Sequence, residues 1–257
     1  NEPKSLDTAF VVMGDIVLST AAQQYGGFTV PEVDKILAPY AQKSYDHYVQ
    51  EFLKYSDPSW EGREEKAVEY AMDKVRRECD QGWQGIEYKL NTVGSSRGDY
   101  PFVTVTLGLG TEMFEKMISI SLLEVHKGGQ GKKGHKKPVL FPKIVFLYDK
   151  AIHGPGCICE DVFEAGVDCS AKTMYPDWLS MSGEGYISSM YQKYGRVISP
   201  MGCRAFLSPW FERGGMEPAD DEDKPVFVGR FNIGAVSLHL PMILAKARGE
   251  DRDFREV

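Results

Sequence analysis

The segment PFVTVTLGLGT, residues 101–111, determines the fold class predicted from this sequence. Residues 102–106 combine aromatic, β-branched and Thr side chains, a composition typical of a β-strand. A helix is expected directly after it, over residues 111–126. A second short apolar run at 143–148 has the composition of a strand buried on both faces, and a helix is expected over 158–172. Strands that alternate with helices indicate an α/β barrel or a wound sheet.

The sequence before this segment is helical by pattern. Residues 7–24 carry Ala, Val and Ile near helical spacing and stop at a Gly-Gly pair. The tetrapeptide TVPE at 29–32 has the form of a capping box, and an amphipathic helix is expected from there to about residue 52. A third helix is expected over 61–78. Three successive helices indicate a bundle whose apolar face is either an internal core or a dimer surface, and periodicity alone leaves both open.

The sequence after this segment contains two more strand-like runs and two loops. The strand-like runs are residues 225–228 and 233–238. Residues 127–138, KGGQGKKGHKKP, form a Gly- and Lys-rich loop that is either simply solvated or a flap that meets phosphates. Residues 217–224, EPADDEDK, are acidic, and a solvated turn is favoured there over a metal site.

Composition restricts the class of protein. The chain has 257 residues, 42% of them hydrophobic and 26% charged, which is typical of a soluble globular protein. A net charge of −7 argues against a general nucleic-acid binder, and no apolar run approaches the roughly 20 residues of a membrane span. The 5 cysteines favour free thiols in a reducing cytoplasm. Because the first residue is Asn and neither end has a natural signal, the chain is expected to be part of a longer one.

Cys203 lies in the sharpest local feature, SPMGCRAFL at residues 199–207. The Pro and Gly residues can hold an irregular backbone that presents one thiol from a loop. Three interpretations remain open from the residues alone. Cys203 is a buried structural cysteine, a thiolate nucleophile supported by a cation such as Arg204, or a thiyl radical, which needs an apolar and water-poor cavity.

Two other motifs carry weaker signals. Asn232 stands between glycines in GRFNIGAVSL, where its amide can either hold a small polar ligand or stabilise a turn, and the local sequence favours the turn. Gly108-Leu109-Gly110 follows a strand and precedes a helix but lacks the third glycine of a dinucleotide-binding fingerprint. Its backbone N–H groups are expected to offer an anion site at the helix start.

An ordered series of segments resembles the anaerobic class of ribonucleotide reductase. The segments are PKS (3–5), YGG (25–27), LAPY (37–40), SY (44–45), EY (87–88), NT (91–92), PFVTVTLGLGT (101–111), LFPKIVF (140–146), CSAKTMYPD (169–177), SPMGCRAFLSPW (199–210) and GRFNIGAVSLHLP (229–241). They run through nearly the whole chain. The order of the set, rather than any one segment, carries the resemblance.

The resemblance implies a fold. It is part of a ten-stranded α/β barrel of the ribonucleotide reductase and glycyl-radical enzyme type, with a cysteine-bearing loop inside, preceded by a helical bundle. Residues 1–257 are then a single domain, the central portion of the catalytic barrel. Residues 1–90 are the helical dimer and effector region, and residues 91–257 hold the barrel strands and helices with the cysteine loop.

The resemblance also implies an activity, the anaerobic reduction of ribonucleoside triphosphates to deoxyribonucleoside triphosphates by thiyl and glycyl radical chemistry, with formate as reductant. Cys203 would carry the radical and Asn232 would be associated with formate, with Met201 and Arg204 as active-site support. One alternative is a nucleotide-binding regulatory or assembly module without catalysis. A formate-lyase relative that shares the barrel is a third interpretation, against which the quoted motifs argue.

Regulation and partners are implied in the same way. ATP and deoxynucleotide effectors bind the family at its dimer interface, which maps here onto Asp15, His47, Lys89 and Phe102. Two of these depart from the family pattern, which has an amide near Asp15 and a Lys near His47, so Asp15 would have to face a base or ribose.

The complete enzyme would be a cytoplasmic homodimer activated by an S-adenosylmethionine and iron–sulfur enzyme, with a glycyl radical and a four-cysteine zinc site near its C-terminus. Neither motif occurs in this chain, so no cofactor or metal, no nucleic acid and no membrane is expected here, and the chain alone is expected to be inactive.

Overall fold

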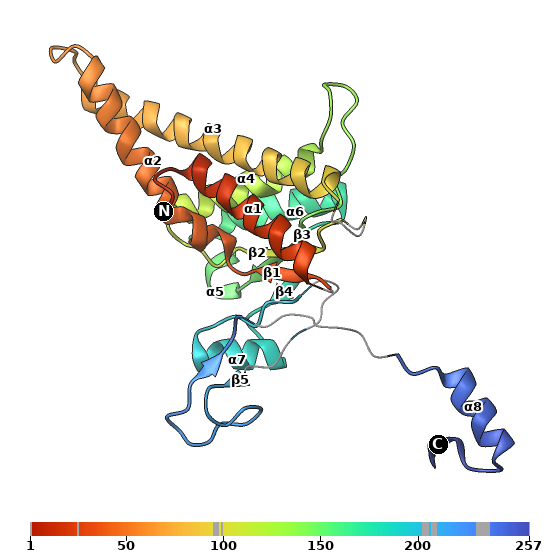
Figure 1. Cartoon of the computed structure of the whole chain (residues 1–257). Coiled ribbons are helices and arrows are strands. Elements are labelled where there is room, and N and C mark those ends of the chain that lie inside the picture. Colours follow the sequence, from red (N-terminus) through yellow and green to blue (C-terminus); the bar gives the residue numbers. More distant parts are fainter. Residues whose placement is uncertain are drawn as a thin grey trace.

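A parallel four-stranded sheet is the centre of the fold (Figure 1). The structure is a computed structural model that describes residues 2–24, 26–94, 98, 100–201, 206, 210–229 and 237–256. The strands are β1 (Phe28–Val30), β2 (Val103–Leu107), β3 (Lys143–Tyr148) and β4 (Asp177–Ser180), and they lie side by side in chain order. Every neighbouring pair is parallel, so each connection must cross over, and helices provide the crossovers.

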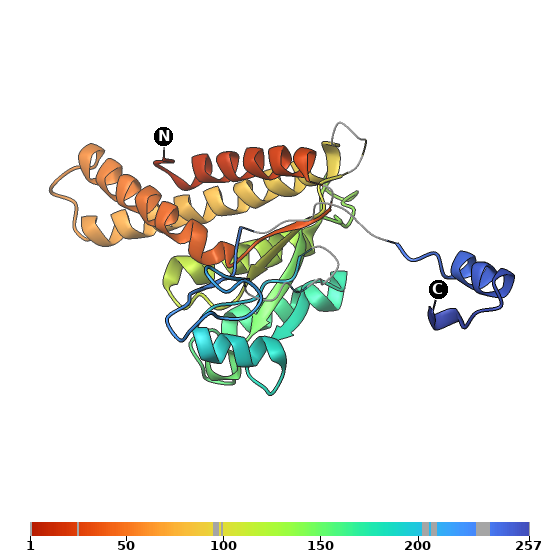
Figure 2. The same cartoon turned by 60° about the horizontal axis from the view of Figure 1, so that its bottom comes forward.

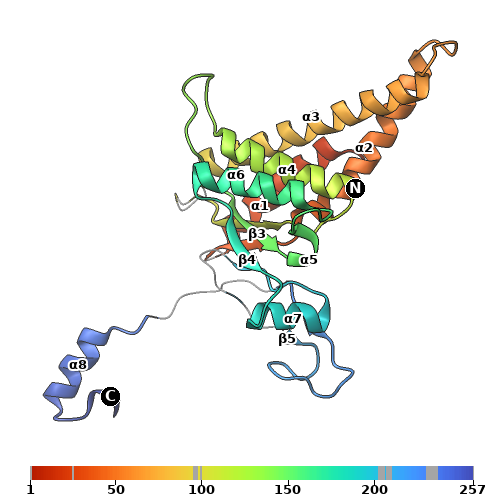
Figure 3. The same ribbon diagram turned by 180° about the vertical axis from the view of Figure 1, so that it is seen from behind.

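Among the described elements, five helices cover one face of the sheet. They are α1 (Leu6–Gln23), α2 (Val33–Tyr55), α3 (Arg63–Thr92), α4 (Met113–Gly128) and α6 (Glu160–Thr173). Figure 2 shows α1 lying along α3, and Figure 3 shows α4 and α6 against the sheet from behind. The buried apolar side chains of these helices form one core with the helix-facing residues of the strands.

The two faces of the sheet differ because side chains alternate along a strand. Val103, Val105 and Leu107 of β2 belong to the helix-side core, so Thr104 and Thr106 lie on the opposite face. In β3, Val145 and Leu147 lie on that opposite face and form a second apolar cluster with α7 (Tyr186–Tyr194). The second face is therefore covered by a short helix and by loops, not by the bundle.

Smaller elements complete the described chain. They are α5 (Lys150–His153), a hairpin of β5 (Trp210–Phe211) with β6 (Pro225–Val226), α8 (Leu240–Gly249) and the short 3₁₀ helix η1 (Phe254–Glu256). In Figures 1 and 3, α8 and η1 lie apart from the rest of the protein. Within the described parts of the chain, only α1 is long and apolar enough to cross a membrane, and one side of it is buried in the bundle as a core helix would be.

Most of the elements predicted from periodicity are confirmed, but the predictions at two helix ends are wrong in detail. Residues 29–32 are not a capping box, because β1 includes Thr29 and Val30, and Glu32 has a left-handed backbone without a side-chain cap. A capping box occurs instead at Glu112 of α4. Helix α3 ends at Thr92 rather than near residue 78. Residues 230–236, which hold most of the second predicted strand at the C-terminal side, lie outside the described residues.

The fold class is confirmed as mixed α/β with a parallel sheet and helices. The ten-stranded barrel remains a proposal, since the described residues contain four strands of one sheet and a two-stranded hairpin. The two predicted loops are present. Residues 127–138 fold back with an antiparallel bridge between Gln130 and Lys137. The acidic segment is a turn organised by Asp223, whose carboxylate accepts hydrogen bonds from the backbone N–H groups of Arg213, Gly214 and Ala219.

Candidate functional site

The segment that leads into Cys203 contacts the second face of the sheet. Val197 is buried in the apolar cluster formed by Val145 and Leu147 of β3. Ile198 and Met201 are also buried, with 3% and 6% of their surface exposed. Residues 197–201 therefore lie against the sheet, on the face that the helical bundle does not cover.

Two threonine hydroxyl groups contact this segment. The Thr29 hydroxyl of β1 donates a hydrogen bond to the carbonyl oxygen of Pro200. The Thr106 Oγ1 atom of β2 accepts a hydrogen bond of 2.7 Å from the backbone N–H of Glu32. The same Oγ1 atom lies 3.5 Å from the hydroxyl oxygen of Ser199. The sequence pattern places Thr29 at the first position of an expected capping box and Thr106 only within a strand, so neither contact was predicted.

A cavity of about 100 Å³ lies beside the segment. It is lined by Thr29, Pro31, residues 197–199, Met201 and residues 227–229. The chain entering the Pro-Met-Gly-Cys-Arg motif and the chain entering the Gly-Arg-Phe-Asn motif thus meet at one cavity. Met201 lies in its wall, whereas Cys203, Arg204 and Asn232 lie outside the described residues, so their roles stay predictions.

The Gly-Leu-Gly turn after β2 does not offer its N–H groups to an external anion. The backbone N–H groups of Gly108 and Gly110 both donate to the carboxylate of Asp34, at 2.9 and 3.2 Å. The prediction of an open anion site is therefore wrong for these two groups. Gly108 has a φ of +113°, which side-chain-bearing residues rarely adopt, so glycine is required at that position.

Two of the four predicted effector residues form an ion pair. Lys89 Nζ of α3 lies 3.0 Å from Asp15 Oδ1 of α1, and both side chains are partly exposed. The pair offsets the negative charge of Asp15, which would otherwise oppose a phosphate. Lys89 also borders a cavity of about 390 Å³ between α1 and α3, lined on the α3 side by Gly82, Gly85 and Ile86.

The other two predicted effector residues lie in different surroundings. His47 is exposed on α2, and its ring contacts that of Tyr48 at 5.6 Å between centroids. Phe102 packs edge-on against Phe141 at 5.3 Å, next to the Lys143 ammonium group. The structure therefore brings Asp15 and Lys89 together, while the ring contacts of His47 and Phe102 involve other residues.

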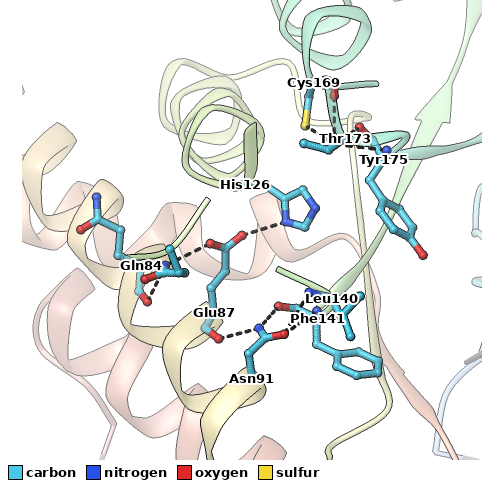
Figure 4. A network of polar contacts seen from close by, with 10 residues as sticks. Gln84, Glu87, Asn91, His126, Leu140, Phe141, Cys169, Thr173 and Tyr175 are labelled. Carbon is cyan, nitrogen blue, oxygen red and sulfur yellow. Dashed lines mark hydrogen bonds and ion pairs between the residues drawn. The ribbon is translucent and has the colours of Figure 1, made fainter. Parts of the chain in front are cut away.

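A buried polar network links the end of α3 to the basic loop (Figure 4). Glu87 Oε1 lies 2.8 Å from His126 Nδ1, and both side chains are almost fully buried. Glu87 Oε2 also accepts a hydrogen bond from Gln130, at the start of the loop. The Asn91 amide oxygen accepts hydrogen bonds from the backbone N–H groups of Leu140 and Phe141, just beyond its end. Helix α3 therefore holds both sides of the 127–138 loop.

Only a faint signal for this network exists in the sequence. Glu87 and Asn91 both belong to the short segments EY and NT that carry the family resemblance. No chemical role followed from those segments alone, because the partners of both residues lie far away in the sequence.

The described cysteines are free thiols, and three of them are buried. Burial raises the pKa of the Cys79 thiol to about 12 and also raises the pKa of the Cys159 and Cys169 thiols, so these three remain protonated at neutral pH. Cys157 is half-buried. In the part of the chain that the structure describes, no group of three or more His, Cys, Asp or Glu side chains could hold a metal ion.

Comparison with known proteins gives a consistent result. A family model described as anaerobic ribonucleoside-triphosphate reductase matches residues 1–257. Proteins named anaerobic ribonucleoside-triphosphate reductase from Haemophilus influenzae and Escherichia coli are each 34% identical over 98% of this chain and 32% of their own length. The protein of that name from Enterobacteria phage T4 is 34% identical over 94% of this chain and 36% of its own length.

The chain thus spans about a third of the length of these relatives. The match covers all the structural units described above, from the helical bundle to the segment that leads into Cys203. A family match over the full chain, with relatives 34% identical over nearly all of it, shows that the chain belongs to the anaerobic ribonucleoside-triphosphate reductase family.

Proposed function

We propose that the protein containing this chain reduces ribonucleoside triphosphates to deoxyribonucleoside triphosphates, with Cys203 as its radical-carrying residue. One observation supports this beyond the family match. Met201, two residues before Cys203, and Gly229, three residues before Asn232, line the same small cavity. The two motifs to which the proposal assigns the chemistry therefore approach one another, although they are far apart in the sequence.

The chemistry assigns a distinct task to each group. The Cys203 thiyl radical takes the hydrogen atom from the ribose 3′-carbon, and an S–H bond forms. The 2′-hydroxyl then takes up a proton and leaves as water. Formate supplies two electrons and its hydrogen as it is oxidised to carbon dioxide, and they form the new C–H bond at the 2′-carbon. The S–H hydrogen then returns to the 3′-carbon, which regenerates the thiyl radical. An apolar surrounding suits this cycle because it keeps water from the reactive intermediates.

The neighbouring residues bind and orient. Asn232 would hold formate through its amide donors, and Arg204 would supply a positive charge beside the loop. Met201 gives the cavity a soft, apolar wall. The glycyl radical, its S-adenosylmethionine-dependent activating enzyme and the zinc site belong to the wider enzyme in this proposal, and its free thiols fit a reducing cytoplasm.

The direct test replaces the thiol in the full-length protein. Cys203→Ser is expected to abolish formation of deoxynucleotide while nucleotide binding stays within error of the unmodified protein. Cys157→Ser is the matched control, since it changes a half-buried free cysteine in the connection between α5 and α6, and turnover should remain. Retained turnover in Cys203→Ser would refute the assignment.

Regulatory nucleotide binding is a second proposed role, and the Asp15–Lys89 pair favours it. In the assembled homodimer, Lys89 would contact the effector phosphates while Asp15 faces the ribose or base. His47 and Phe102, whose ring contacts involve other residues, would contact the nucleotide only at its edges. Effector binding needs no catalysis. The same site is therefore also compatible with the alternative that the chain is a nucleotide-binding regulatory module.

Calorimetry with deoxynucleoside triphosphates separates the two roles. Lys89→Met is expected to weaken effector binding by about tenfold or more, as loss of one charge-assisted phosphate contact would. Lys66→Met, at the far exposed end of the same helix, should leave binding unchanged. Equal affinity in both variants would place the effector elsewhere. Binding together with turnover that survives Cys203→Ser would favour a regulatory module over the reductase site.

A further inference from the structure

We propose that Thr29 and Thr106 are positioning residues that fix residues 199–201 against the sheet and thereby set the place of Cys203. Neither touches the reacting atoms in this proposal, which rests on the proposed function of Cys203. Each acts through the backbone or side chain of the segment that precedes the thiol. The two threonines stand on neighbouring strands, β1 and β2.

Strand alternation explains why Thr29 reaches the segment. Phe28 and Val30 pack against the helix-side core, so the residue between them points to the other face. That face carries Val197 and the rest of the second apolar cluster. The alternation that packs Phe28 and Val30 against the helices therefore places the Thr29 hydroxyl on the face that residues 197–201 contact.

The Thr29 hydroxyl supplies a donor to the Pro200 carbonyl. Pro200 and Met201 are buried, and a buried backbone carbonyl that lacks a donor costs free energy comparable to a lost hydrogen bond. The Thr29 hydroxyl supplies the donor across a sequence separation of 171 residues. The bond thus ties the middle of the segment to a strand of the sheet.

Thr106 adds a second, longer contact to the segment. Its Oγ1 atom accepts the N–H of Glu32, where the chain turns from β1 into α2 with φ 44°. Because the oxygen of the Thr106 hydroxyl accepts that bond, its hydrogen is available for another contact. The Ser199 hydroxyl oxygen lies 3.5 Å away. One fully buried side chain thereby connects the β1–α2 turn to the residue before Pro200.

Radical transfer makes such fixing functionally important. Hydrogen-atom transfer needs the sulfur within contact distance of the ribose carbon, and a displacement of about 1 Å can cost about a hundredfold in rate. The contacts of Thr29 with Pro200 and of Thr106 with Ser199 lie three and four residues before the thiol in the sequence.

The reactivity of the thiol tests the proposal without any need for turnover. In the full-length protein, alkylation of Cys203 by iodoacetamide would be followed by peptide mass spectrometry, with Cys157 as the reference thiol in the same sample. Thr29→Val removes the hydroxyl at nearly constant volume and should change the Cys203 to Cys157 rate ratio by about threefold or more, as expected when a segment loses a fixed point. Thr29→Ser keeps the hydroxyl and should leave the ratio as in the unmodified protein. Ser199→Ala removes only the longer contact with Thr106 and should change the ratio less than Thr29→Val does.

The control is Thr173→Val, which removes a hydroxyl that donates a hydrogen bond of 2.9 Å to the Cys169 carbonyl at the end of α6. It should leave the ratio unchanged. An unchanged ratio in Thr29→Val, or the same change in Thr29→Ser, would overturn the proposal. Unfolding temperatures of all variants show whether each variant is folded.

Turnover gives a second readout. Thr29→Val should lower kcat by about tenfold or more with KM nearly unchanged, because placement of the thiol is altered and not substrate binding. If Cys203→Ser keeps turnover, the proposed function fails, yet the alkylation ratio still decides whether Thr29 positions the segment. If Cys203→Ser is inactive and Thr29→Val is fully active with an unchanged ratio, only the positioning role fails.

Discussion

The carboxylate of Asp34, near the start of α2, lies 2.9 Å from the backbone nitrogen of Gly108, at the end of β2. The same oxygen accepts hydrogen bonds from Gly110 N–H and from the Ser119 hydroxyl. Asp34 has no exposed surface, and burial raises the pKa of its carboxyl group above the usual value. One buried acidic side chain thus joins α2, the Gly-Leu-Gly turn and α4.

Asp34→Asn should therefore destabilise the protein although it changes few atoms. The carboxamide has one acceptor oxygen, so the donors at Gly108, Gly110 and Ser119 and the N–H of Lys35 cannot all be satisfied. Unpaired buried donors cost about 1–3 kcal/mol each, so the free energy of unfolding should fall by about 2–3 kcal/mol. Urea unfolding measures this directly.

The matched control lies on the same helix. Asp46→Asn changes an exposed carboxylate that accepts one hydrogen bond from Gln42, and it should alter stability by less than about 0.5 kcal/mol. Equal effects at the two positions would show that the Asp34 contacts do not stabilise the turn.

A pair of glycines in α3 gives a second prediction. A Cβ atom added at Gly82 would lie 2.1 Å from the Phe10 ring of α1, whereas one at Gly85 would meet nothing within 4 Å. Gly82→Ala should destabilise the protein by about 1–3 kcal/mol, because α1 must shift. Gly85→Ala should instead stabilise it by up to about 1 kcal/mol, since alanine favours helix.

Thermal unfolding compares the two variants. Opposite signs are expected, and destabilisation by both would mean that the α1–α3 contact is not the cause. A shift of α1 should also disturb the Asp15–Lys89 pair, which joins the same two helices, so Gly82→Ala is expected to weaken effector binding as well.

These glycines also explain a limit of the sequence-based prediction. Periodicity placed α1, α2, β2 and β3 well, because each has a one-sided or continuous apolar pattern. The predicted end of α3 was too early, because Gly82 and Gly85 resemble a helix end, although apolar side chains continue at helical spacing through Trp83 to Leu90. A Cβ atom at Gly82 would collide with the Phe10 ring of α1, so this glycine allows α1 to approach α3 closely, and that contact is not visible in local sequence.

Two more elements were missed for a related reason. Strand β4 is short and half-exposed, with alternate residues facing solvent, and α7 has only Ser188 fully buried. Strand β4 has no long apolar run. Helix α7 has apolar side chains at helical spacing, but it contains only 9 residues, so its pattern is short. Their structure depends on packing against β3 and the second apolar cluster.

Part of the candidate site could be predicted from the sequence and part could not. The resemblance located the motifs around Cys203 and Asn232, and the cavity shared by Met201 and Gly229 supports that pairing. It did not identify Thr29 or Asp34. Both act through hydrogen bonds to residues more than 70 positions away, and a single sequence has no signal for such contacts.

The pH dependence of stability should report on His153. Its Nε2 atom lies 2.8 Å from the Gly108 carbonyl oxygen, its Nδ1 atom accepts from the Asp149 N–H, and burial lowers its pKa below the usual value. The unfolded chain takes up the proton first, at a pKa of about 6.5. The stabilisation by neutral His153 is therefore complete above about pH 6.5 and is lost as the pH falls from there through the lowered folded pKa.

Urea unfolding between about pH 7.5 and about pH 5.5 tests this, with a slope of up to about 1.4 kcal/mol per pH unit assigned to one proton. His153→Gln should remove that part of the slope. His135→Gln, in the exposed basic loop, should not. An unchanged slope in His153→Gln would mean that another group causes the acid sensitivity.

The buried Glu87–His126 pair yields the last prediction. Both side chains are 1% exposed or less, and their atoms lie 2.8 Å apart. Glu87→Ala removes the carboxylate partner of His126 and one of the two acceptors of the Gln130 amide. Removal of one partner of a buried pair costs about 3–5 kcal/mol. The free energy of unfolding should fall by that amount. Protection of the Leu140 and Phe141 amides from hydrogen exchange should fall too, because the end of α3 that carries Asn91 is loosened.

Glu250→Ala is the control, since it breaks exposed pairs with Lys246 and Arg252 and should cost less than about 1 kcal/mol. Glu87→Gln separates charge from hydrogen bonding, because its amide oxygen can still accept from His126. If Glu87→Gln is as stable as the unmodified protein while Glu87→Ala is not, the hydrogen bond is what matters. If Glu87→Ala also costs less than about 1 kcal/mol, the network does not hold the basic loop to α3.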